Sequence, residues 1–169
     1  SKFNKTQATE QLRRRTIKVA PETVDKKTVE NAKAQDHFLA IMLLQPKLRD
    51  YLEIMEPEML FADQARQLLA FLKTHSDFTG KPEQAAALKQ IGDYVKIIVL
   101  QYEELYQGLE ITELRYEAAR LQARLVEQFV KNQKQTLSAK LHEADDATTQ
   151  TLLTEAKQLD SLLKRVTGR

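Results

Sequence analysis

Apolar residues recur along most of this chain at intervals of three and four, which is the spacing of one face of an α-helix. The pattern begins near Thr28 and becomes continuous in the seven apolar residues of the segment 38–44. Gln45-Pro46 follows, and a residue before proline is disfavoured in helical conformation. The Leu, Met and Ala content of the run favours a buried helix over a strand. The sequence therefore predicts a helix over about residues 28–44.

Proline and glycine mark the ends of the next expected elements. After Pro46 a short segment leads to a second helix, which is entered near Met59 and ends near Ser76. Four apolar residues at helical spacing define its buried face: Ala65, Leu68, Leu69 and Leu72. A further helix is predicted from Pro82, a residue that suits a first helical turn, to Gly92.

Residues 94–100 have the composition of a strand, but their spacing favours a helix. Five apolar positions fall at intervals of three and four and predict one helical face: Val95, Ile98, Tyr102, Leu105 and Leu109. Gly108 is expected to break this helix before the next element begins.

The stretch between Gly108 and Gly168 contains neither glycine nor proline. An apolar stripe in its first half predicts a helix of roughly 35 residues, which would be about 50 Å long. The stripe comprises Ile111, Leu114, Ala118, Leu121 and Leu125, and continues through Phe129, Leu137 and Leu141. A helix of this length is expected to bridge two units.

A second helix is expected after the polar residues 142–149, where Asp145, Asp146 and Thr148 are candidate N-cap residues. Its apolar residues repeat as a seam: Leu152, Ala156, Leu159, Leu163 and Val166. The short connection predicts that the two helices pack antiparallel as an αα-hairpin. Leu153 and Leu162 flank the seam and widen the apolar surface beyond what a contact between two helices requires.

These elements predict an all-α fold, in which a compact helical bundle is joined by a long helix to a C-terminal antiparallel helical hairpin. We expect a basic linker or arm over residues 1–27, a bundle subdomain over residues 28–108, and the bridging helix and hairpin over residues 109–169. Because the sequence opens with Ser1, it is interpreted as a processed or excised piece of a longer protein.

The charge distribution limits the classes of partner. The formal net charge is +2, but residues 1–35 hold nine Lys or Arg against four Asp or Glu. The remainder is slightly acidic, so nucleic-acid binding is expected only as a weak contact by Arg13, Arg14, Arg15 and Lys18 in the arm.

The longest apolar run is far shorter than the roughly 20 residues that a membrane-spanning helix needs. No membrane contact is therefore predicted.

The residues that carry chemistry do not converge on a catalytic pattern. The absence of cysteine excludes disulfides and thiolate zinc sites, and it fits a cytoplasmic protein. His37, His75 and His142 are isolated, and Asp146 stands where a zinc-protease helix would place its second histidine. An acidic cluster next to four tyrosines (Tyr94, Tyr102, Tyr106 and Tyr116) is interpreted as a solvated face or an interface: Glu103, Glu104, Glu110, Glu113 and Glu117. No catalytic residue, metal site or cofactor is predicted.

Two segments give the chain a family resemblance. Residues 38–50 read Phe-Leu-Ala-Ile-Met-Leu-Leu-Gln-Pro-Lys-Leu-Arg-Asp, and residues 61–69 read Phe-Ala-Asp-Gln-Ala-Arg-Gln-Leu-Leu. Together with the helix containing residues 114–121 and the terminal hairpin, they resemble the C-terminal helicase-binding domain of bacterial DnaG-type primases. The resemblance covers about residues 28–166 and depends on the order and spacing of degenerate, leucine-rich segments.

The resemblance implies a docking function without catalysis. In that family the hairpin binds the N-terminal domains of the hexameric replicative helicase, and the bundle contributes to helicase stimulation, so that primer synthesis is recruited to the replication fork. The implied contact residues of the hairpin are Leu137, Leu141, Leu152, Leu153, Leu159, Leu162, Leu163, Lys164 and Arg165. Three other interpretations stay open. They are a self-associating helical scaffold, a helical nucleic-acid-binding module that uses the basic arm, and the N-terminal domain of a replicative helicase, which is also a helical bundle with a hairpin.

Overall fold

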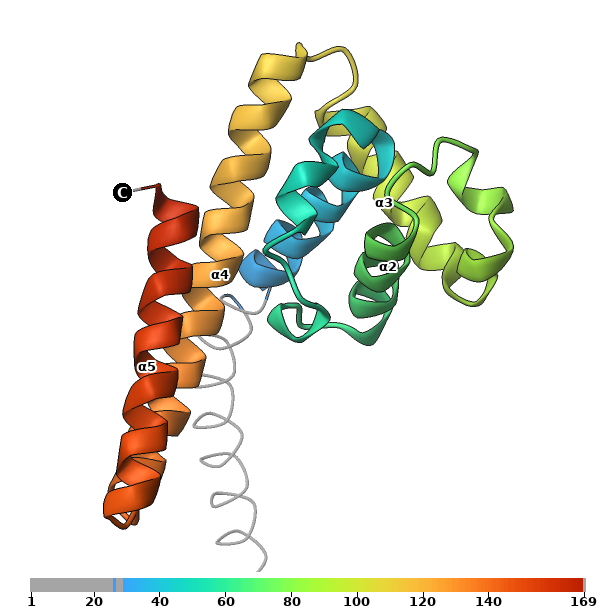
Figure 1. Cartoon of the computed structure of the whole chain (residues 1–169). Helices are drawn as coiled ribbons and strands as arrows, with labels where there is room; N and C mark the ends of the chain where they lie inside the picture. Colours follow the sequence, from blue (N-terminus) through green and yellow to red (C-terminus); the bar gives the residue numbers. More distant parts are fainter. Residues whose placement is uncertain (1–25, 27–28, 169) are drawn as a thin grey trace, which may run out of the picture. The chain divides into compact units, whose positions relative to one another are not determined.

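The computed structural model describes Lys26 and residues 29–168, and in this part of the chain the regular elements are all helices (Figure 1). This confirms the predicted all-α fold. Contacts divide the chain between residues 33 and 34, and residues 34–169 form a compact unit. The architecture described below is that of this unit, together with residues 29–33 at the start of its first helix. It contains both the bundle and the hairpin, and the boundary between them at residues 108 and 109 stays a prediction.

The first helix of the bundle covers residues 29–44 and is followed directly by η1 (Pro46–Leu52), a 3₁₀ helix. The backbone leaves the α-helix at Gln45, whose φ is −126° and ψ is 85°. This confirms that Gln45-Pro46 ends the helix. Five residues in the second half of this helix are entirely buried and belong to the core: Phe38, Leu39, Ala40, Ile41 and Met42.

The second predicted helix is α2 (Asp63–Thr74), and all four residues of its expected face are fully buried. Its start has no side-chain cap from its own N-cap residue, Ala62. Instead the buried Gln35 of the first helix accepts a hydrogen bond from the backbone N–H of Phe61 at 2.8 Å. Gln35 therefore fixes the turn between η2 (Pro57–Met59) and α2. It gives the N–H of Phe61 an acceptor that the neighbouring residues do not provide.

The helix predicted from Pro82 to Gly92 is wrong in type. The segment forms two 3₁₀ helices, η3 (Pro82–Gln84) and η4 (Ala86–Ile91), with Ala85 in extended conformation between them. The spacing of the residues that pack toward the core explains why the segment is not an α-helix. These residues lie three positions apart: Pro82, Ala85, Leu88 and Ile91. A period of three matches the 3₁₀ helix and not the α-helix.

The stretch with strand composition is a helix, as its spacing predicted, and forms α3 (Gly92–Leu105). The predicted face is correct only as far as Tyr102. Leu105 and Leu109 are 47% and 41% exposed, whereas Tyr106 is buried and contacts the ring of His37 edge-on. Tyr106 lies one turn beyond Tyr102 and takes the inward position. The chain then turns at Gly108, whose φ of +92° suits a residue without a side chain.

The long helix is α4 (Ile111–Leu141), which has 31 residues. At 1.5 Å per residue its length is about 46 Å, close to the expected value. Its buried stripe begins at Leu114, because Ile111 is 41% exposed. Figure 1 shows α5 (Asp146–Thr167) running back along α4, so the antiparallel arrangement of the two helices agrees with the prediction.

Candidate functional site

The candidate site is the hairpin of α4 and α5, and its turn is defined by a side-chain cap. Asp145 is the N-cap of α5, and its Oδ1 accepts a hydrogen bond from the backbone N–H of Thr148 at 2.8 Å. That bond holds the pKa of Asp145 below its usual value. Gly168 ends α5 with a φ of +73°, and its N–H donates to the carbonyl of Lys164. Both ends of the helix are therefore specified by local sequence.

The two helices are held together by a narrow apolar seam. Near the turn, Leu137 of α4 and Leu152 of α5 are each 6% exposed. Farther from the turn, the seam joins the main core, against which several half-buried residues of α5 pack: Leu159, Leu162, Leu163 and Val166. Lys134 and Asp160 also form an ion pair between the helices. The end of the hairpin near the turn therefore depends on few buried side chains.

The nine residues expected to contact a partner fall into three groups. Leu137 and Leu152 are buried and stabilise the hairpin itself. Half-buried positions are Leu141, Leu159, Leu162 and Leu163, and exposed positions are Leu153, Lys164 and Arg165. Leu153 stands out because it is 43% exposed next to a buried neighbour. The contact role of these residues stays a prediction, but only the exposed group is freely accessible.

The first half of α4 is fixed to the bundle through η1. Gln122 is buried, and its Nε2 donates to the backbone carbonyl of Tyr51 at 2.7 Å. Arg115 forms an ion pair with Asp50 at 3.3 Å, and its guanidinium lies 5.8 Å from the centre of the Tyr51 ring. Sequence reasoning assigned no role to Gln122. A polar residue on an otherwise apolar stripe was the available signal that it satisfies a buried backbone group.

The tyrosines near the acidic cluster are mostly part of the core. Tyr94, Tyr102 and Tyr106 are buried, so the suggested tyrosine interface is wrong for these three, while Tyr116 is 77% exposed. The hydroxyl of Tyr94 donates to Asp36 at 2.6 Å. Burial raises the pKa of Asp36, and it raises that of Tyr106 to about 12. The hydroxyl of Tyr94 and the ring of Tyr106 thus belong to the packed interior of the bundle.

The other candidate chemistry does not converge into a site. Four of the clustered glutamates are exposed: Glu103, Glu104, Glu110 and Glu113. The fifth, Glu117, forms an ion pair with Arg120. His37 and His75 contact aromatic rings, and His142 is exposed. Within the described residues no three His, Asp or Glu side chains lie where they could hold a metal ion. Across the same part of the chain, no helix has both the length and the apolar character to cross a membrane.

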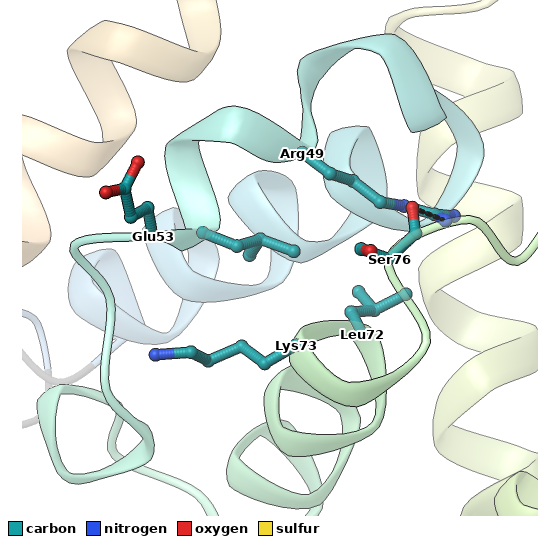
Figure 2. Close-up of a pocket in the computed structure, with 6 residues that line it drawn as sticks. Arg49, Glu53, Leu72, Lys73 and Ser76 are labelled. Carbon is teal, nitrogen blue, oxygen red and sulfur yellow. Dashed lines mark hydrogen bonds between the residues drawn. The ribbon is translucent and has the colours of Figure 1, made fainter.

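Arg49 is a buried charge that sequence reasoning missed (Figure 2). Its guanidinium donates to the carbonyls of Met42 and Leu43 at the end of the first helix, at 2.8 and 2.9 Å. It also donates to the carbonyls of Ser76 and Phe78 after α2, at 3.0 and 2.6 Å. Burial lowers the pKa of Arg49.

Arg49 therefore joins the C-terminal ends of two helices, whose backbone carbonyls would otherwise lack hydrogen-bond donors. Figure 2 shows its guanidinium beside Ser76 at the edge of a small pocket, whereas Lys73 extends away from it. The guanidinium is therefore engaged by backbone carbonyls and is not turned toward a ligand in the pocket. The signal in the sequence was an arginine just beyond a helix that ends in buried residues.

The basic residues of the arm, Arg13, Arg14, Arg15 and Lys18, lie outside the described residues. The hairpin is consequently the strongest candidate site of the part that the structure describes. Compared with known proteins, the chain matches no family model, no curated protein and no solved structure.

Proposed function

We propose that this chain is a helicase-binding domain of a bacterial DNA primase, and that the α4–α5 hairpin is the element that docks on the replicative helicase. The observation that carries the proposal is the terminal hairpin itself, which has its own narrow seam and exposes Leu153 beside it. An exposed apolar side chain on a pair of packed helices is suited to docking on another helical surface.

Features of the bundle and of its connection to the hairpin are consistent with this function. In the bundle the rings of His37 and Tyr106 pack edge-on and Tyr102 lies beside Tyr106, and within the described residues no three His, Asp or Glu side chains lie where they could hold a metal ion. The firm connection of α4 to η1 would transmit a load on the hairpin to the bundle, because Gln122 and Arg115 tie the two together. Such a tether would recruit primer synthesis to the replication fork in the bacterial cytoplasm. It would also modulate the activities of the helicase and the primase.

The direct test is co-purification of the chain with the N-terminal domain of the replicative helicase from the same organism. We expect a stable complex with the chain of 169 residues and none with a variant that lacks residues 145–169. Circular dichroism on the truncated variant must show that the bundle remains folded. A complex that survives the truncation would contradict the role of the hairpin.

A self-associating scaffold is the competing function, and sedimentation velocity separates it from the proposal. We expect the isolated chain to be a monomer at micromolar concentration and to sediment faster only when the helicase domain is added. A stable dimer of the isolated chain would favour the scaffold.

A further inference from the structure

A second pocket lies where the turn between α3 and α4 meets the start of η1, and its volume is about 430 Å³. We call it the turn pocket. Apolar side chains from both parts of the chain form its walls: Pro46, Leu109, Ile111 and Leu114. Small-molecule sites commonly have volumes of about 300–1,000 Å³ and mostly apolar walls with a few polar groups. The turn pocket therefore has the size and the lining of a site for a small ligand.

Two of these walls are apolar residues that the fold leaves accessible. Leu109 and Ile111 occupy positions that the sequence pattern predicted to face inward, yet each is 41% exposed, because both border the pocket and not a packed neighbour. Leu114, one turn farther along α4, is buried. An aliphatic chain in the pocket would cover Leu109 and Ile111 and remove their apolar area from water.

Lys47 determines the charge of the turn pocket. It is the single charged residue among the described residues that line it, and Gln45 and Thr79 are the polar ones. Lys47 is exposed and forms no ion pair with another described residue. Gln45 is held in place, because its Nε2 donates to the hydroxyl of Tyr102 at 2.7 Å. An unpaired ammonium next to apolar walls is complementary to a carboxylate on an aliphatic chain.

The two glutamates at the start of α4 are directed away from the pocket. Glu110 has an extended conformation between Leu109 and Ile111, and successive side chains of an extended segment point to opposite sides. Glu113 lies about 200° around the helix from Ile111 and about 100° from Leu114. Neither glutamate lines the pocket. They therefore do not supply a partner for the ammonium of Lys47.

The aspartates closest in sequence to the lining residues have partners elsewhere. Asp50 forms an ion pair with Arg115 at 3.3 Å. Asp77 interacts electrostatically with the buried Arg49. The positive charge at the edge of the turn pocket is therefore available to a ligand.

We infer that the turn pocket binds a small aliphatic carboxylate, whose chain packs against Leu109 and Ile111 and whose carboxylate pairs with Lys47. The inference does not depend on the proposed function, because the α4–α5 turn and the helicase take no part in it. Its failure would leave the proposed function untouched.

The test is a titration of the 169-residue chain with octanoate, followed by the amide signals in two-dimensional NMR spectra. We expect saturable shifts at Thr79, Leu109 and Ile111, with a dissociation constant on the order of 1 mM for so small a ligand. Acetate, which lacks the chain, and octanamide, which lacks the charge, should each bind about threefold more weakly or less well still. Shifts spread over other exposed apolar residues, with none that saturate at the pocket, would overturn the inference.

Matched lysine variants test the charged contact. Lys47→Gln should weaken octanoate binding about two- to fivefold, which is the effect of an accessible ion pair, and should leave octanamide binding unchanged. Lys81→Gln is the control, because Lys81 is an exposed lysine close to Thr79 in sequence that does not line the pocket. Equal affinities of the two variants for octanoate would contradict the pairing with Lys47.

Matched apolar variants test the wall. Ile111→Gln should weaken the binding of octanoate and of octanamide about fivefold or more, because the chain loses its apolar contact. Leu105→Gln makes the same kind of change at a residue that is 47% exposed outside the pocket, and it should leave both affinities unchanged. Circular dichroism checks that the variants are folded. If Ile111→Gln binds octanoate as well as Leu105→Gln does, the turn pocket is not the site.

Discussion

Individual side chains in this protein satisfy backbone groups at a distance, and Arg49 has the largest such role. Its guanidinium connects carbonyls at the end of the first helix with carbonyls after α2, while the side chain is 6% exposed. Burying a guanidinium costs free energy unless its N–H groups find hydrogen-bond acceptors. The backbone carbonyls around Arg49 in turn need the guanidinium as their donor.

Replacement of Arg49 should therefore destabilise the fold strongly. For Arg49→Met we expect a loss of about 3 kcal/mol or more in the free energy of unfolding, because several buried carbonyls lose their donors. Arg49→Lys should restore little, since an ammonium lacks the planar fork. Urea denaturation measures both. As a control, Arg120→Met, at a surface pair with Glu117 within α4, should cost less than about 1 kcal/mol; equal losses would contradict the structural role of Arg49.

Asp145 has a local role that depends on pH. Its pKa is lower in the folded chain than in an unfolded one, because its carboxylate accepts the N–H of Thr148. The cap therefore stabilises α5 above the ordinary pKa of aspartate, and this contribution is lost as the pH falls through the lower, folded pKa.

We expect amide exchange in the first turn of α5 to quicken in Asp145→Ala at neutral pH, and Asp145→Asn, which also caps helices, to show much less change. The neighbouring substitution Asp146→Ala provides the control, because Asp146 is in the first turn but is not the N-cap residue. If Asp145→Ala and Asp146→Ala gave equal rates, the assigned cap would be wrong.

Adjacent leucines of α5 show how an element is divided between stability and binding. Leu152 is buried in the seam, whereas Leu153 is 43% exposed. For Leu152→Ala we expect a loss of about 2 kcal/mol or more in the free energy of unfolding, and for Leu153→Ala less than about 0.5 kcal/mol. Thermal or urea denaturation of the two variants measures this difference. Similar losses at both positions would mean that the seam is assigned to the wrong face.

Much of this element structure was predictable from the sequence, because glycine, proline and helical spacing act locally. The end of the first helix at Gln45 and the break at Gly108 were predicted from short-range rules, and Asp145 was one of three N-cap candidates that those rules offered. The 3₁₀ helices between Pro82 and Ile91 were not, since their three-residue period becomes visible only once the inward residues are known.

The contacts of the candidate site were less predictable than its helices. The sequence indicated that Leu153 lies beside a seam, but not which side of the hairpin is covered. That information is in the hydrogen bond of Gln122 to Tyr51, which joins residues 71 positions apart. Arg49 was missed for the same reason, because its acceptors after α2 are 27 and 29 residues away.

At the scale of the whole molecule, a bundle carries a long helix whose far half is paired chiefly with α5. The first part of α4 shares the core of the bundle, and the part near the turn is held by Leu137, Leu152 and an ion pair. Regions with few buried contacts open most readily in solution. The end of the hairpin should consequently exchange its amide hydrogens faster than α2 or α3 in the free chain.

Hydrogen exchange of the chain with and without the helicase N-terminal domain is the most direct test of the central claim. We predict slower exchange on binding within residues 131–165, with the greatest change around Leu153, and unchanged exchange in α2 and α3. Protection of α2 or α3 without any protection in the hairpin would contradict it.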